Sequence, residues 1–202
     1  NDVSIADASA FSAFNSKVLL DSCNSLGRSQ QTGESFDQDV KIIENEVGVT
    51  TQYTGLPSSR RRHNLTLRGA GRHAVWQLRQ LIHFLRGRQT SFYLSSFSKD
   101  IIAKADLISG GNTMLIEHVG YTKFVKTRQP RNIIRVTFTD GSAPVIRTIT
   151  GSSEVDASTE TLTLDGTWSQ TYPLATIRAI QYLEEVRLDS DRVTLEHAPG
   201  AR

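Results

Sequence analysis

The sequence predicts a mainly β protein, a sandwich or barrel-like domain with one principal amphipathic α-helix packed on it, and therefore an α+β fold overall. Short alternating segments are separated by turn signals every ~8–12 residues, a spacing typical of sandwiches and barrels. Only residues 72–86 show a strong helical period. The 202 residues are enough for one large domain or two small ones, with a buried core.

The composition is that of a globular protein without a membrane span. Hydrophobic residues make up 38% of the chain and charged residues 22%. The net charge of +2 is too small to indicate that the whole protein is attracted to nucleic acid or anionic lipid. No apolar run approaches the ~20 residues of a spanning helix, and the first residues lack the regions of a signal peptide. The single cysteine, Cys23, excludes an internal disulfide and a cysteine-based zinc site and favours a reducing compartment.

The N-terminal part differs in composition from the rest. Residues 1–35 are rich in Ser, Asn, Ala and Gln and predict an arm or extended segment, whereas 36–202 predict a single β-rich domain. Within that domain, 36–55 alternate as two strands around a bend at 46–48, and 64–68 alternate as another strand.

One helix is predicted over residues 72–86. Gly87 is placed to end it as a left-handed cap, and Arg86 lies in the last turn, where a cation suits the helix dipole. Arg72 and Arg79 lie mostly off its apolar stripe. The stripe has a period of 3.6 residues and consists of Ala74, Val75, Leu78, Leu81, Ile82 and Leu85.

Strands dominate after the helix. Asp140-Gly141 predicts a tight hairpin turn, and 152–158 predict a polar loop. Residues 177–188 fit either a helix or a strand, and the surrounding β pattern favours a strand. The other predicted strands are 92–97, 114–119, 121–125, 133–138, 145–149, 161–164 and 193–196.

No motif indicates catalysis. The sequence has no HExxH, no GxSxG elbow, no P-loop and no GxGxxG, so we expect no enzyme and no cofactor. The five histidines have no metal-ligand spacing, so a metal site would require convergence in the tertiary structure, and none is predicted. Asp189 and Asp191 are interpreted as a solvated turn because the EF-hand spacing is missing.

Charge is strongly segregated along the chain. Residues 56–98 contain no Asp or Glu, and all of their strongly basic residues are arginines, whose planar fork pairs readily with carboxylates and phosphates. An acidic cluster directly precedes this block. The residues proposed to meet at a subunit interface are Arg60, Arg61, Arg62, Arg72, Arg79, Arg86 and Arg88 on the basic side and Asp37, Asp39, Glu44 and Glu46 on the acidic side.

Three interpretations of this pattern stay open. The basic block is a solvated face, a surface that neutralises phosphates of a nucleic acid, or one side of a contact between copies of the chain. Between the two functional interpretations, the near-neutral net charge favours subunit contact.

A run of glycine, aromatic and polar residues directly follows the helix. Its members are Gly87, Arg88, Phe92, Tyr93, Leu94, Ser95, Ser96, Phe97, Asp100 and Ile101. This junction resembles a pattern in tail-tip proteins of long-tailed bacteriophages, the minor tail or distal-tail-like proteins. Ser95 stands where the family usually has proline, and the C-terminal segment 185–197 is similar to the closing strands of the same proteins.

The resemblance covers about Arg60 to Arg202 and implies a structural virion component. Such a protein forms a symmetric ring or adaptor between the tail tube and the distal tip or receptor-binding apparatus, is assembled in the host cytoplasm, and has no catalytic role. Its partners would be itself and other tail proteins of the tube, hub and tip. Two alternatives remain: a nucleic-acid-binding module that uses Arg60–Arg88, and a carbohydrate-binding β-sandwich with Trp168 and Tyr172 as sugar platforms.

Overall fold

A computed structural model of the chain forms two compact units, residues 1–22 with 79–202 and residues 23–78. The predicted boundary at residue 35 differs from this division, because residues 12–20 pair with the sheet of the first unit. The described residues are 11–20, 26–28, 33–37, 40–45, 49–54, 60–64, 67–69, 71–125 and 131–194.

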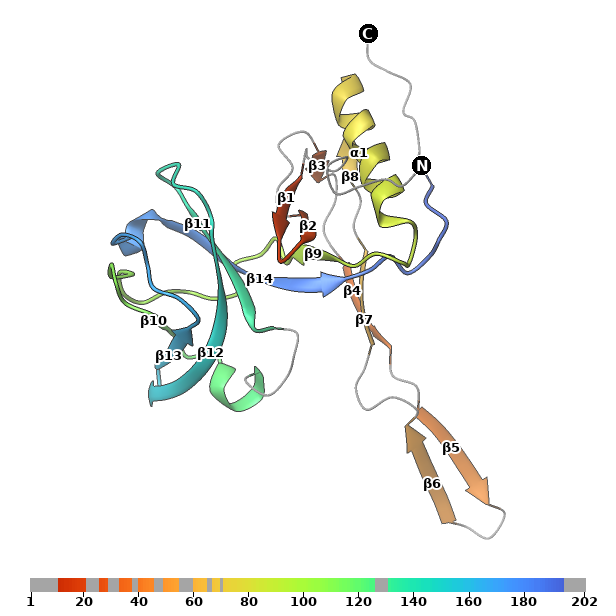
Figure 1. Cartoon of the computed structure of the whole chain (residues 1–202). Helices are drawn as coiled ribbons and strands as arrows, with labels where there is room; N and C mark the ends of the chain where they lie inside the picture. The colour runs from red at the N-terminus through yellow and green to blue at the C-terminus, as the bar shows by residue number, and fades with distance from the viewer. Residues whose placement is uncertain are drawn as a thin grey trace. The chain divides into compact units, whose positions relative to one another are not determined.

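The first unit is built on one eight-stranded mixed sheet (Figure 1). Every neighbouring pair is antiparallel except β2 and β9, which run parallel. In spatial order the strands are β1 (Ser12–Phe14), β2 (Lys17–Leu20), β9 (Phe92–Ser95), β14 (Ile177–Val186), β11 (Ile133–Phe138), β12 (Val145–Asp156), β13 (Thr159–Leu164) and β10 (Thr113–Glu117).

An irregular segment, 100–109, joins β14 to β10. Ile101 bridges to Ile180 of β14, and Ala103 bridges to Ile116 of β10. Backbone N–H groups of Lys104 and Glu117 donate across the same gap, at 2.9 Å to Leu115 and Ile102 respectively. Hydrogen bonding therefore continues from one end of this part of the sheet back to β14.

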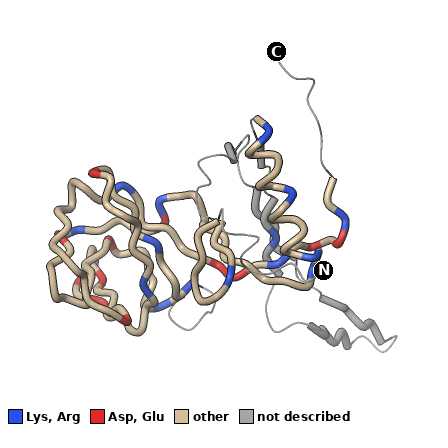
Figure 2. The backbone as a smooth tube through the Cα atoms, turned by 45° about the horizontal axis from the view of Figure 1, so that its top comes forward, with Lys and Arg blue, Asp and Glu red and all other residues tan. Residues whose placement is uncertain are grey.

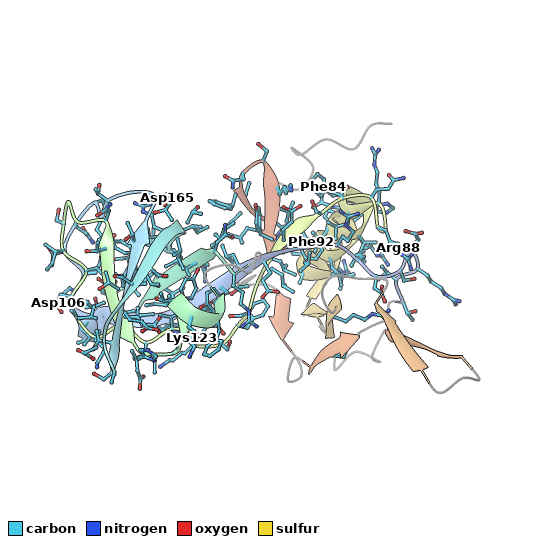
Figure 3. The ribbon with its side chains drawn as sticks, turned by 90° about the horizontal axis from the view of Figure 1, so that it is seen from below. Phe84, Arg88, Phe92, Asp106, Lys123 and Asp165 are labelled. Atoms are coloured by element: carbon cyan, nitrogen blue, oxygen red, sulfur yellow. The ribbon has the colours of Figure 1, made fainter. Side chains whose placement is uncertain are left out.

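The main core lies on the inner face of β10 to β14. Phe138 stacks on Tyr172 with ring centroids 4.1 Å apart, and Trp168 meets Tyr172 edge to face at 6.2 Å. Loops are tied to this core by carboxylates labelled in Figure 3, since Asp165 accepts the Thr148 N–H at 3.0 Å and Asp106 accepts the Leu174 N–H at 2.8 Å. Fully buried members include Leu107, Met114, Ile116, Ile134, Val136, Leu162 and Ile180.

The N-terminal hairpin is part of the sheet rather than an arm. β1 and β2 form a hairpin, and β2 pairs with β9 through Leu19 opposite Tyr93. Leu19, Tyr93 and Leu183 form a second small buried cluster. Residues 12–20, for which the sequence predicted an arm or extended segment, therefore form extended strands of this sheet, and Leu19 completes the cluster.

The second unit contains three two-stranded antiparallel ladders. The ladders are nested: β5 and β6 form the hairpin at the tip, the strands before and after them form the next pair, and the outermost two strands form the third (Figure 1). The unit therefore resembles one long β-ribbon folded on itself. The pairs are β3 (Leu26–Arg28) with β8 (Leu67–Gly69), β4 (Gly33–Asp37) with β7 (Arg60–Asn64), and β5 (Val40–Asn45) with β6 (Val49–Thr54).

The predicted helix is confirmed as α1 (Gly71–Leu85). Its apolar stripe is buried at Ala74, Leu81 and Leu85. The helix ends in a left-handed turn, with Arg86 at φ 48° and Gly87 at φ 65°. Two short helical turns, η2 (Tyr121–Val125) and η3 (Leu174–Thr176), complete the regular structure of the described residues.

Most predicted strands downstream of α1 are confirmed, including 133–138, 161–164 and the ambiguous segment at 177–188. Tyr121–Val125 is a π-helical turn and not a strand, because Gly120 at φ 72° reverses the chain and buries Tyr121.

The predicted polar loop at 152–158 is also wrong over most of its length. β12 continues to Asp156, because its backbone pairs with β13. Residues 193–194 form no strand, whereas 195–196, like the predicted bend at 46–48 and Cys23, lie outside the described residues.

Candidate subunit interface

The outer face of α1 carries one stripe of cationic and aromatic side chains. Its members are spaced four, three, four and three residues apart, which places them within about 80° of one another around the helix. All of them are exposed. Figure 2 shows basic positions along α1 and no acidic one. The stripe consists of Arg72, Trp76, Arg79, His83 and Arg86.

Trp76 is the residue in this stripe that the charge pattern alone missed. Its side chain is 59% exposed, the second-highest value among the large hydrophobic residues of the described chain. Exposed tryptophan beside arginine is the side-chain pair enriched at the energetic centres of protein interfaces. The same i, i+4 and i+7 spacing that links Arg72, Trp76 and Arg79 in sequence could have found it.

The structure brings part of the acidic and basic segments together within one chain. In the β4–β7 ladder, Asp37 stands directly opposite Arg60 and Glu34 opposite His63. The acidic and basic clusters therefore need no second copy in order to meet at this point.

The remaining basic residues of the ribbon stand opposite neutral ones. Arg61 is opposite Phe36, and Arg62, whose side chain is exposed, is opposite Ser35. On the acidic side, Glu44 in β5 is opposite Thr50 and not opposite a basic residue. Asp39 and Glu46 lie outside the described residues.

Arg88 follows the helix in a turn that is fixed by the C-terminal segment. Its backbone N–H donates to Asp191 Oδ1 at 2.9 Å, and its side chain is exposed. A β-carbon at Gly87 would lie 3.0 Å from the Asp191 Cα, so the close approach requires glycine. The predicted solvated turn at 189–191 therefore has a structural role, in holding the end of α1.

The proposed sugar platforms are not on the surface. Trp168 is 1% exposed and Tyr172 is 4% exposed, and both belong to the main core. Sugar rings stack on exposed aromatic faces, so this pair cannot serve as a platform. The carbohydrate-binding alternative loses the residues on which it rested.

A second polar cluster was not visible in the sequence. His118, Glu154 and Glu160 come from three different strand regions, yet their ligand-type atoms lie within 4.8 Å of one another. The sequence predicted no metal site unless ligands that are distant in the sequence converged in the tertiary structure, and these three residues do converge. Spacing along the sequence carries no information on this convergence, which the register of the strands produces.

Comparisons with known proteins add no identification. No family model matches the chain, and no curated protein matches it. Among the described residues, no helix has the length and apolarity required to cross a membrane. The functional proposal therefore rests on the sequence resemblance and on the geometry of this chain.

Proposed function

We propose that this chain is a structural component of a bacteriophage tail tip, which assembles with copies of itself into a symmetric ring. The ring would join the tail tube to the distal tip or receptor-binding proteins. The resemblance around Phe92–Ile101 suggests the family, and two surfaces support an assembly role: the β-ribbon and the outer stripe of α1.

The ribbon is the observation that carries the proposal. Each of its three ladders has only two strands in the described residues. Isolated two-stranded ladders are marginally stable in water, and their outer edges present unpaired backbone groups that pair readily with another strand. A ribbon of this kind gains stability when a neighbouring subunit covers it.

The two edges of the ribbon carry residues of opposite charge. β4 carries Glu34 and Asp37, whereas β7 on the other edge carries Arg60, Arg61 and Arg62. An acidic edge and a basic edge on one surface favour a head-to-tail contact between identical copies. Contacts of this type close into rings when the rotation between subunits permits it.

The first unit supplies a stable body for such an assembly, and we propose that it is a closed barrel. Bridges from Ile101 and Ala103 link β14 to β10, so the strands from β10 to β14 have no free edge there. Closure removes the edges through which a sheet would aggregate without specificity. In the described residues, assembly contacts are thereby left to the ribbon, the helix and the outer edge of β1, which pairs only with β2.

The test is the assembly state of charge-reversed protein. In the wild type we expect rings by electron microscopy and one high-mass species by mass photometry. The double variant Arg79→Glu/Arg86→Glu should assemble at least about 10-fold less well, because like-charge contacts at an interface cost several kcal/mol. Circular dichroism should show an unchanged fold.

Arg178→Glu provides a matched control. Arg178 is an exposed arginine on β14, outside the basic block. Its reversal changes net charge in the same direction and should leave the rings intact. A wild-type chain that stays monomeric at all concentrations and never enters particles would contradict the proposal.

A nucleic-acid-binding role is the second candidate, favoured by the absence of any acidic residue on α1. Arg72, Arg79 and Trp76 could together contact phosphates and a base. Binding to single-stranded DNA should then weaken as salt rises, with a log–log slope of about −0.7 per phosphate contact. No binding at low salt would remove this candidate.

A further inference from the structure

A histidine and two glutamates lie close together where β10 and β12 end and β13 begins. Glu160 stands directly opposite Glu154 across the β12–β13 ladder and opposite Ile116 across the β10–β13 ladder. His118 follows two residues after Ile116, and its backbone N–H donates to Ser158 O at 3.0 Å. Strand alternation places these residues on one face.

Glu160 is the most unusual of the three. It is 0% exposed, and its Oε1 atom has no hydrogen-bond partner in the structure. Its other oxygen, Oε2, accepts the Thr122 N–H of η2 at 3.2 Å; the same turn carries Lys123, labelled in Figure 3. A buried carboxylate oxygen that accepts no hydrogen bond destabilises the folded state. Glu160 Oε1 is therefore a candidate ligand for a bound cation.

The unpartnered oxygen points into the cluster. His118 Nε2 lies 3.4 Å from Glu160 Oε1 and 3.8 Å from Glu154 Oε1. Thr122 Oγ1 is also buried and without a hydrogen bond. One nitrogen and two carboxylate oxygens therefore lie within 4.8 Å of one another.

These separations fit a shared cation better than a shared proton. Charge-assisted N–H···O bonds are about 2.7–2.9 Å long, and one proton on Nε2 can serve only one carboxylate at a time. Ligands of tetrahedral zinc, bound at about 2.0–2.1 Å, lie roughly 3.3–3.4 Å apart. Small adjustments of the exposed Glu154 would bring all three into that range.

Charge balance points the same way. Two carboxylates directly opposite on one sheet face repel each other. The nearby Lys104 does not neutralise them through hydrogen bonds, since its Nζ donates to Ser158 and Thr159 at the β12–β13 turn. Glu154 is half-exposed and leaves a path from solvent.

We infer that His118, Glu154 and Glu160 form a binding site for a divalent transition metal of the zinc type, with water as the remaining ligand. Imidazole with carboxylates is a donor set that suits zinc and its neighbours in the first row. The ion ties together the ends of β10, β12 and β13. Its role is structural, because it holds these three strands together beside η2, whose Thr122 N–H donates to Glu160.

The experiment is a titration of the full, chelator-treated chain with Zn²⁺ near neutral pH. Calorimetry should give one site per chain, and Co²⁺ should show the absorption of tetrahedral coordination. Zn²⁺ at 100 times its Kd should raise Tm by roughly 5–10 °C. Glu160→Gln keeps the shape and the acceptor for Thr122, yet should weaken binding by at least the roughly 10–100-fold that even outer-shell changes cost.

His118→Gln provides a second test on a partly exposed residue, so that a folding defect in Glu160→Gln cannot hide the result. His73→Gln, an exposed histidine on α1 outside the interface stripe, is the matched control and should bind Zn²⁺ as the wild type does. The inference is overturned if the wild type binds Zn²⁺ no more tightly than His118→Gln, or if His73→Gln removes the binding.

Discussion

The two units of the chain solve the problem of holding a β-structure together in different ways. In the first, eight strands share one sheet and a core that includes Trp168, Ile134 and Leu162, all at most 1% exposed. In the second, three two-stranded ladders follow each other along a ribbon. A sheet with a buried face supports itself, whereas a two-stranded ribbon does so only marginally.

This difference indicates that the first unit determines the stability of the fold and that the ribbon determines its association. Substitutions in the first unit should change the free energy of unfolding, and substitutions in the ribbon should change association.

The two tryptophans offer the sharpest contrast. Trp168→Ala should destabilise the first unit by about 3–5 kcal/mol, because it removes a fully buried aromatic side chain from the core. Trp76→Ala should change the unfolding free energy by no more than about 0.5 kcal/mol, because the side chain is 59% exposed. Denaturant unfolding followed by circular dichroism measures both.

Equal destabilisation by the two substitutions would contradict the assignment of core and surface. Tryptophan fluorescence provides an independent check, since the chain has 2 tryptophans. The Trp76→Ala variant retains only the buried Trp168 and should emit at shorter wavelength than Trp168→Ala.

The end of α1 should show the next-largest effect. Gly87→Ala should cost about 1–3 kcal/mol, because φ is 65° and the added β-carbon meets Asp191. Gly141→Ala is the control: φ is 84° there, but nothing lies within 4 Å of the new atom. Thermal unfolding should therefore show a larger loss at Gly87.

Asp191→Ala in the Gly87→Ala background should recover part of that loss by removing the steric conflict. The part due to the left-handed backbone should remain. Asp191→Ala alone should cost the hydrogen bond from the Arg88 N–H, so the recovery is measured against that single variant. Losses of the two single variants that simply add would contradict the steric conflict.

Alkaline pH should weaken the first unit through its buried tyrosines. Burial, followed by the neighbouring Tyr121 and Asp100, raises the pKa of Tyr182, and burial also raises the pKa of Tyr121. Folded-state pKa values above the unfolded value of about 10 mean that stability is complete below pH 10 and is lost as pH rises above it, by up to about 1.4 kcal/mol per pH unit for each tyrosine.

Tyr182→Phe should reduce that slope, as measured by urea unfolding at a series of pH values above neutrality. Curves for wild type and variant that stay parallel above about pH 10 would show that Tyr182 ionises equally in both states.

Shortening the ribbon should have the smallest effect on stability. Asp37 and Arg60 stand directly opposite each other, so residues 38–59 can be replaced by an Asn-Gly turn without changing the β4–β7 register. Unfolding of the first unit should change by no more than about 0.5 kcal/mol. Ring formation, measured by mass photometry, should be lost.

A shortened chain that no longer unfolds cooperatively would mean that the ribbon stabilises the first unit. A shortened chain that still forms rings would assign assembly to α1 alone.

The sequence predicted correctly those helices and strands whose own hydrophobic pattern determines their conformation. The helix follows from a stripe that includes Leu81 and Leu85, and β11 from the alternation at 133–138. Residues 121–125 have the composition of a strand, but Gly120 at φ 72° turns the chain into a π-helical turn. Residues 152–156 are polar and nevertheless continue β12, because backbone pairing with β13 suffices there.

Long-range register could not be predicted in the same way. The pairing of Asp37 with Arg60 depends on three successive ladders, and the meeting of His118 with Glu154 and Glu160 depends on the register of three strands. The charge segregation pointed to the arginines on α1 but not to Trp76, because a census of charge ignores aromatic residues.

The parallel pair of β2 and β9 has a consequence for the order of folding. Leu19 and Tyr93 become neighbours only after the ribbon and α1 between them have been traversed, and closing so long a connection carries an entropic penalty. The antiparallel hairpins of β11 to β13 are local and should form early. We expect the N-terminal hairpin to dock last, and its backbone amides to be among the first of the sheet to exchange hydrogen with solvent.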